Sequence, residues 1–204
     1  MKKFLALLRK DWRLNRAAMI TLLITALGPY VLLPGDPSQA AVYVSILNFV
    51  PAAALGGAAF ARERREHWDD FLAVMPVSQL QIISSKLLVA LGPLALTTTL
   101  NIAVLMSGHS NTTSIEGLSS YLCLLLAIFG LAWLLSALLP SPAIAAVTSL
   151  LVVVAAAMID SAIVDAAHHV NPNITAPMWA GAGVLAVFAG CICHARRLSL
   201  ELPL

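Results

Sequence analysis

The chain has 204 residues, of which 60% are hydrophobic and only 11% charged, and its formal net charge is +2. Its mean hydropathy is +0.89, whereas about a quarter of the residues in a soluble domain are charged. This composition excludes an ordinary soluble domain and predicts an all-α membrane protein. The small positive charge does not indicate a nucleic-acid partner, because the basic residues are placed as topology signals and lipid contacts.

Residues 1–16 are predicted to form an amphipathic helix that lies in the cytoplasmic interface of the membrane. On a helical wheel, lysines and arginines occupy one arc and apolar side chains the other, with Trp12 at headgroup depth. Asp11 falls inside the apolar arc. Two interpretations remain open: its carboxylate turns toward water or pairs with Asn15 or a nearby lysine, or it forms a salt bridge to a basic group of the neighbouring loop.

Six uncharged segments are long enough to cross a membrane. A hydrocarbon core about 30 Å thick requires roughly 20 apolar residues in a helix. The predicted spans are 17–34, 40–61, 86–107, 118–139, 142–164 and 176–194. Because the connections between them are short, we expect a single transmembrane domain over residues 1–204.

The basic residues predict the orientation. Lysines and arginines near helix ends mark the cytoplasmic side. With six spans, all 12 of them fall on one face, so both termini are expected to be cytoplasmic. They form three groups: Lys2, Lys3, Arg9, Lys10, Arg13 and Arg16; Arg62, Arg64, Arg65 and Lys86; Arg196 and Arg197.

The loop at residues 62–76 is predicted to contain a short amphipathic helix. Its apolar residues recur at helical spacing, and charges of both signs occupy the positions between them. Pro76 ends this helix, and Ser78 with Gln81 forms a capping box that begins the third span. A simple solvated reversal would not require an apolar stripe, which instead favours docking into a groove on a soluble partner. The stripe consists of Trp68, Phe71, Leu72 and Met75.

This loop resembles the first cytoplasmic loop of type-two ATP-binding-cassette exporter permeases. The family pattern is roughly E-r-e-x-G-T-l-E-x-L-l-x-x-P-v-s-r-x-x-i-i-x-x-K. There are two departures from the pattern: His67 and Trp68 replace the usual Gly-Thr pair, and the shorter Asp70 stands where the pattern has a glutamate. The N-terminal LLRKDWRLNR also resembles the family's elbow helix. The matching residues are Glu63, Asp70, Leu72, Pro76, Val77, Ser78, Ile82, Ile83 and Lys86.

The resemblance implies a multi-pass permease of the bacterial inner membrane that exports a hydrophobic or amphipathic peptide, drug or lipid. The sequence has no G-x-x-x-x-G-K-[ST] phosphate loop. We therefore expect no enzymatic activity and no cofactor, with ATP hydrolysed by separate ATPase subunits and a second permease copy or paralogue as partner. Residues 66–74 would be the coupling helix. The implied coupling residues are Glu63, Glu66, Trp68, Asp69, Asp70, Phe71, Leu72, Met75 and Pro76.

Polar residues inside spans are the candidates for the substrate path, because they are costly in lipid unless they face protein or water. The strongest are Asn48, Thr98, Asn101 and Asp160. Most in-span hydroxyls are expected to bond backbone carbonyls or a neighbouring helix. By resemblance, the first and fifth spans would meet the partner permease, and the second and fifth would line the cavity. We expect no metal site at Cys191, Cys193 and His194, because residues two apart on a helix point in different directions.

Other classes fit the sequence less well. A substrate-binding membrane subunit of an energy-coupling-factor importer has the same size and topology, but it does not need a charged helix after the second span. An intramembrane protease or lipid phosphatase would need several acids or histidines converging within the spans. A scaffold without a transport role is a third alternative.

Overall fold

The computed structural model describes residues 2–32, 37–65, 78–107, 115–167 and 172–200 of the chain. Every element in these ranges is an α-helix, which confirms the predicted all-α class. The helices are α1 (Lys2–Leu14), α2 (Arg16–Leu32), α3 (Pro37–Leu47), α4 (Phe49–Arg65), α6 (Gln79–Ser107), α7 (Ile115–Leu138), α8 (Pro142–Ala167) and α9 (Pro172–Leu200).

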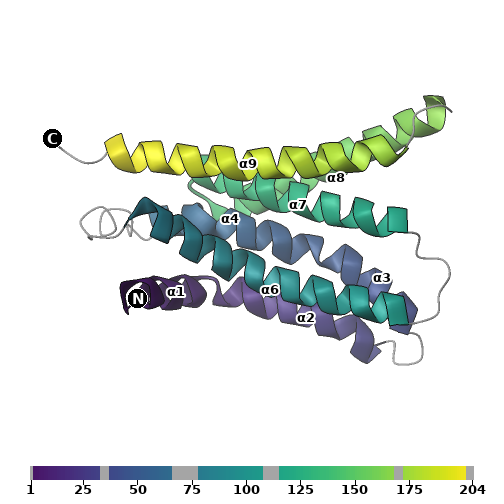
Figure 1. Ribbon diagram of the computed structural model, residues 1–204, viewed down its shortest axis with the longest axis horizontal. Coiled ribbons are helices and arrows are strands. Elements are labelled where there is room, and N and C mark those ends of the chain that lie inside the picture. Colours follow the sequence, from purple (N-terminus) through teal and green to yellow (C-terminus); the bar gives the residue numbers. More distant parts are fainter. Residues whose placement is uncertain (1, 33–36, 66–77, 108–114, 168–171, 201–204) are drawn as a thin grey trace.

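The helices run roughly side by side along the long axis of the molecule (Figure 1). Helix α1, the end of α4, the start of α6 and the end of α9 lie together at one end of this bundle. The three segments that carry the basic residues therefore meet at one end of the bundle. The orientation of that end toward the cytoplasm stays a prediction.

Four helices in the described ranges are long and apolar enough to cross a membrane: Val42–Glu63, Gln79–Ala103, Ser119–Leu138 and Pro177–Arg196. The pair α1 and α2, bent by 64° at Asn15, would make a fifth. The apolar stretch Pro142–Met158 of α8 is shorter. The chain is thus a multi-pass membrane protein with four to five candidate spans, and the sixth span stays a prediction.

The predicted second span contains an irregularity at Asn48, which separates α3 from α4. Backbone hydrogen bonds continue across it, since the Asn48 N–H donates to the Val44 carbonyl at 2.9 Å and the Ala52 N–H donates to the Asn48 carbonyl at 3.1 Å. The break is therefore a local distortion within one membrane-length segment. A polar side chain that competes for local hydrogen bonds is typical of such a position.

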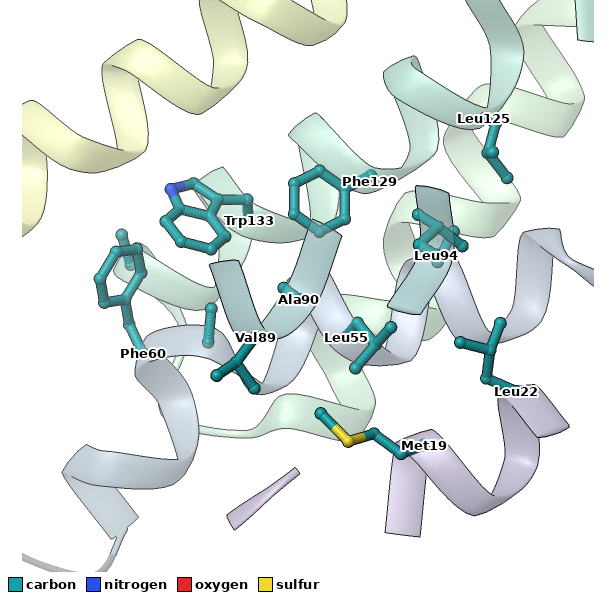
Figure 2. Close-up of a cluster of buried hydrophobic side chains, with 13 residues drawn as sticks. Met19, Leu22, Leu55, Phe60, Val89, Ala90, Leu94, Leu125, Phe129 and Trp133 are labelled. Carbon is teal, nitrogen blue, oxygen red and sulfur yellow. The ribbon is translucent and has the colours of Figure 1, made fainter. Parts of the chain in front are cut away.

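The main core lies where α2, α4, α6 and α7 meet (Figure 2). Met19 and Leu22 from α2 pack against Leu55 of α4, and Phe129 and Trp133 complete the cluster from α7. Within a bilayer, apolar side chains gain little free energy by moving from lipid into the protein. Van der Waals contacts between closely fitting side chains therefore hold the helices together.

Glycines allow close approach among α4, α7, α8 and α9. A Cβ on Gly56 would lie 2.6 Å from the Phe129 carbonyl oxygen, and one on Gly57 would lie 2.8 Å from that of Pro142. These two glycines therefore permit close approach of the α4 backbone to α7 and α8. Helix α9 packs mainly on α7, where a Cβ on Gly130 would overlap the backbone of Gly183.

Candidate functional site

The predicted coupling segment lies largely outside the described residues, but the structure describes both of its ends. Helix α4 ends at Arg65 and α6 begins at Gln79. The Gln81 N–H donates to the Ser78 hydroxyl at 3.3 Å, which confirms one of the two bonds of the predicted capping box. Outside the described residues lie Glu66, Trp68, Asp69, Asp70, Phe71, Leu72, Met75 and Pro76.

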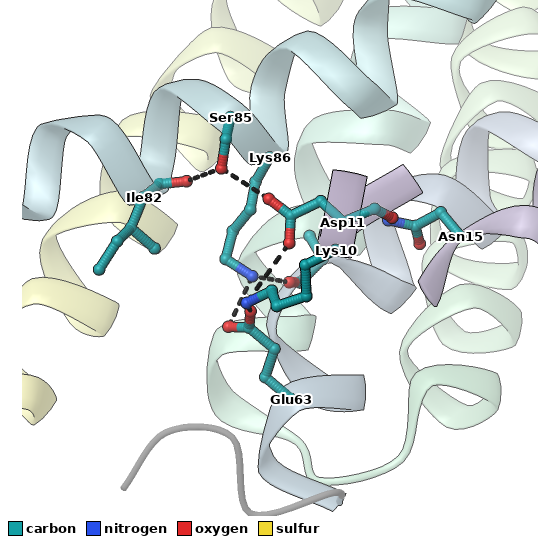
Figure 3. Close-up of polar contacts among 8 residues, drawn as sticks. Lys10, Asp11, Asn15, Glu63, Ile82, Ser85 and Lys86 are labelled. Atoms are coloured by element: carbon teal, nitrogen blue, oxygen red, sulfur yellow. Dashed lines mark hydrogen bonds and ion pairs between the residues drawn. The ribbon is translucent and has the colours of Figure 1, made fainter. Parts of the chain in front are cut away.

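Glu63 is the one predicted coupling residue whose side chain the structure describes, and it is 1% exposed. Its carboxylate joins two other helices (Figure 3). Oε2 forms an ion pair with Nζ of Lys86 on α6 at 2.6 Å, and Oε1 accepts a hydrogen bond from Nζ of Lys10 on α1. A single buried carboxylate therefore connects the last turn of α4 with both neighbours.

Lys86 has three contacts and is 3% exposed. Besides its ion pair with Glu63, its Nζ donates to the Ala59 carbonyl oxygen at 2.7 Å. The same ammonium lies 5.3 Å from the ring centroid of Phe60, within the range of a cation–π contact. Lys86 is held by a charge, a carbonyl dipole and a ring, all on α4, so α6 and α4 are fixed to each other at the base of residues 66–77.

Asp11 completes the cluster from α1 and is 2% exposed. Its Oδ2 accepts a hydrogen bond from the Ser85 hydroxyl at 2.6 Å, and Oδ1 lies 3.6 Å from Nζ of Lys10. Its backbone carbonyl accepts from the Asn15 amide at 3.0 Å. The interpretation that the carboxylate turns toward water is wrong, and it does pair with a nearby lysine. The contact with α6 is a serine hydroxyl rather than a basic group.

The cluster is electrically balanced, with two lysines and two carboxylates in mutual contact. Balance matters because a buried charge without a partner is strongly unfavourable, whereas a buried pair with further hydrogen bonds is tolerated. Lys10 is the most accessible member, with 16% of its side chain exposed. The arrangement suits a rigid junction of α1, α4 and α6, and it contains no hydrolytic geometry.

Two further sets of hydrogen bonds lie deeper in the bundle, and they include Asn48 and Asn101, two of the four predicted substrate-path residues. Asn101 accepts a hydrogen bond from the Tyr30 hydroxyl at 2.6 Å and donates to the Ser45 hydroxyl at 2.8 Å. The Asn48 amide donates to the Tyr121 hydroxyl at 3.3 Å. These bonds connect α2, α3, α6 and α7 inside the membrane-length segments.

The predicted path residues are buried within this single chain. Asn48 is 0%, Asn101 2% and Thr98 5% exposed. The carboxamide oxygen of Asn48 has no hydrogen-bond partner among the described residues, and such a buried acceptor costs about 1–3 kcal/mol. The side chain of Asp160 lies outside the described residues.

Sequence reasoning missed the aromatic side chains beside the charge cluster. Phe60 lies on α4, one turn before Glu63, with His194 of α9 and Trp133 of α7 against its ring. His194, which had been considered only as a metal ligand, is 6% exposed. Spacing along one helix carries no information about such a contact between distant helices, so no signal in the sequence pointed to it.

The comparison with known families decides the class. The family model described as "ABC-2 family transporter protein" matches residues 6–195. The chain belongs to this family. It is therefore the membrane permease component of an ABC-2 type transporter, which is typically a non-catalytic transport subunit. The matched part of this ABC-2 permease begins in α1 and ends in α9. It therefore includes the end of α4 and the start of α6, which flank residues 66–77. No curated protein matches the chain.

Proposed function

We propose that this ABC-2 permease exports a hydrophobic or amphipathic substrate from the bacterial cytoplasm, driven by separate ATPase subunits that bind residues 66–76. In this proposal the chain crosses the inner membrane six times, with both termini cytoplasmic and α1 lying in the interface as an elbow helix. Trp12, 55% exposed on α1, supports the interfacial position because an exposed indole favours the headgroup region.

The observation that supports the coupling role best is the position of the charge cluster. Glu63 lies two residues before the end of α4, and Lys86 lies seven residues after the start of α6. Their ion pair closes the base of the intervening segment, and Lys10 attaches α1 to the same point. A displacement of residues 66–76 by an ATPase would then move three helices together instead of bending one of them.

A second permease is expected to pack against α8 and α2. On α8, exposed apolar residues recur at alternating spacings of three and four, which is the pattern of a helix-packing seam. Helix α2 repeats the pattern. The exposed series are Ile144, Val147, Leu151, Val154 and Met158 on α8, and Ile20, Ile24, Leu27 and Val31 on α2.

The substrate path is proposed to include Asn48, Thr98, Asn101 and Asp160. The unpartnered carboxamide oxygen of Asn48 supports this role, because it would accept a hydrogen bond from a substrate N–H or O–H. Since the three described residues are buried in one chain, they would meet the substrate only when the helices around Asn48 separate during the transport cycle.

The test of the proposal is copurification of the ATPase from native membranes in mild detergent. We expect the parent permease to retain a nucleotide-hydrolysing subunit, and the variant Trp68→Ala, Asp69→Lys, Asp70→Lys to lose it while still inserting into the membrane. The matched control, Trp68→Phe with Asp69→Glu and Asp70→Glu, preserves ring and charge and should retain the subunit. Equal retention by both variants would refute the coupling assignment.

A further inference from the structure

The last helix has a direct contact with the junction of α1, α4 and α6. The imidazole of His194 stacks on the ring of Phe60, with centroids 4.2 Å apart and planes inclined by 27°. Trp133 approaches the same ring edge-on, with centroids 4.8 Å apart and an interplanar angle of 73°. Phe60 is 1% exposed and Trp133 0%. The ring of Phe60 is therefore held on two sides, by α9 and by α7.

Phe60 also links this aromatic group to the charge cluster. The ammonium of Lys86 lies 5.3 Å from its ring centroid while forming the ion pair with Glu63. Phe60 and Glu63 are three residues apart and lie on the same side of α4. A tilt of the Phe60 ring would consequently change the surroundings of the lysine that closes the base of residues 66–77.

The contact gives α9 a second attachment besides its packing on α7. That packing depends on glycines, because a Cβ on Gly183 would lie 2.6 Å from the Leu126 carbonyl oxygen. Glycine contacts allow two backbones to approach closely. A flat ring stacked on another ring adds a contact with a preferred geometry at the end of α9.

We propose that His194 is a positioning residue: it holds Phe60 beneath Lys86, and it thereby joins the end of α9 to the junction of α1, α4 and α6. The ends of α4, α6 and α9 then move as one body. The transport consequence rests on the proposed function, in which this body is displaced by the ATPase. The joining of α9 to α4 does not rest on the proposed function, and it can be measured in the permease alone.

Two substitutions at position 194 distinguish the effect of the stacked ring from the effect of side-chain volume. His194→Phe keeps a flat ring on Phe60, whereas His194→Leu fills a similar space without one. Phe188, 64% exposed on the same helix, provides the matched control Phe188→Leu, which removes a ring that has no place in this cluster. His194→Phe and His194→Leu both replace a polar side chain with an apolar one and differ in whether the stack is kept, while Phe188→Leu controls for the loss of an aromatic ring elsewhere on α9.

The measurement is the distance between spin labels at Ser84 on α6 and Ile192 on α9, both exposed. The native cysteines are first replaced by alanine, and the permease is purified alone. We expect His194→Leu to increase the population of displaced α9 ends about fivefold, as loss of an aromatic pair predicts, and His194→Phe and Phe188→Leu to match the parent. An unchanged distribution in His194→Leu, or an equally broad one in His194→Phe, would overturn the proposal.

Experiments with the ATPase added distinguish the coupling role of residues 66–76 from the positioning role of His194. If residues 66–76 couple as proposed, ATP added together with the ATPase shifts the Ser84–Ile192 distance in the parent and in His194→Phe, whereas His194→Leu binds the ATPase with the parent affinity but has an about fivefold smaller shifted population. Failure of the ATPase to bind the parent permease would refute the proposed function, while the label distances in the permease alone would still decide the role of His194. A shifted population of parent size in His194→Leu would overturn the coupled movement of α9.

Discussion

Neutralising Glu63 is the perturbation whose cost can be estimated most directly from the structure. Glu63→Gln preserves the shape of the side chain but removes the charge that Lys86 faces at 2.6 Å. The side chains of Glu63 and Lys86 are 1% and 3% exposed, so the value for buried pairs, about 3–5 kcal/mol, applies rather than the 0–1 kcal/mol of surface pairs. Because Nζ of Lys86 still donates its hydrogen bond to the Ala59 carbonyl oxygen, we expect a value at the low end of this range, a loss of about 3 kcal/mol in the free energy of unfolding.

The assay is unfolding of the purified permease by titration with sodium dodecyl sulfate in mixed micelles, followed by tryptophan fluorescence. Lys10→Met provides the comparison. The Lys10 side chain is 16% exposed, and Glu63 still forms its ion pair with Lys86 in this variant, so we expect a loss of about 1 kcal/mol in the free energy of unfolding. The double variant Glu63→Gln, Lys86→Met removes both charges. It should be more stable than the sum of the single losses predicts, with a coupling energy of about 2 kcal/mol or more.

Two results would show that Glu63 and Lys86 do not form a buried ion pair of this strength. A change of less than about 0.5 kcal/mol for Glu63→Gln would place the pair among surface contacts. Strictly additive losses in the double variant would show that the two side chains do not interact in the folded permease.

Three further predictions follow from the packing and the hydrogen bonds. Gly130→Val should lower the midpoint of thermal unfolding strongly, because its Cβ would overlap the α9 backbone, whereas Gly181→Ala has open space around it and should match the parent. Asn101→Leu should cost about 1–3 kcal/mol in the same detergent titration, since it deprives two hydroxyls of their partner; Thr99→Ala, which breaks only a bond to its own helix, should cost much less. Asp11→Ala should make α1 more susceptible to limited proteolysis than Asp11→Asn, which can still accept from the serine hydroxyl of α6.

The helices and the base of the loop could be predicted because the sequence carries local signals for them. Apolar runs predicted the helices that include Gln79–Ser107 and Ile115–Leu138 to within a few residues, apart from the extended start of the first. That start was also readable, since Ser78 and Gln81 form a capping pair. Glu63 and Lys86 were singled out by their family motif, and the structure places them in contact.

The contacts between distant helices could not be predicted. Asn48 was recognised as polar, but its hydrogen bond to Tyr121 of α7 could not be predicted from the sequence. Asp11 was recognised as out of pattern, and its partner Ser85 is 74 residues away in the chain. Periodicity reports which face of a helix is apolar, and it does not report which helix covers that face. The stacking of His194 on Phe60 could not be predicted for the same reason, because it joins two helices that are distant in the sequence.

Site-specific photo-crosslinking in living cells would test whether residues 66–76 contact a nucleotide-hydrolysing subunit, as we propose. A benzophenone amino acid at Phe71 should form a covalent product with an ATPase, and the yield should fall when Asp69 and Asp70 are both replaced by lysine. The same probe at exposed Leu151 on α8 should yield no ATPase product. Crosslinks from Phe71 to lipid or to periplasmic proteins, without any ATPase product, would show that this segment does not couple the permease to an ATPase.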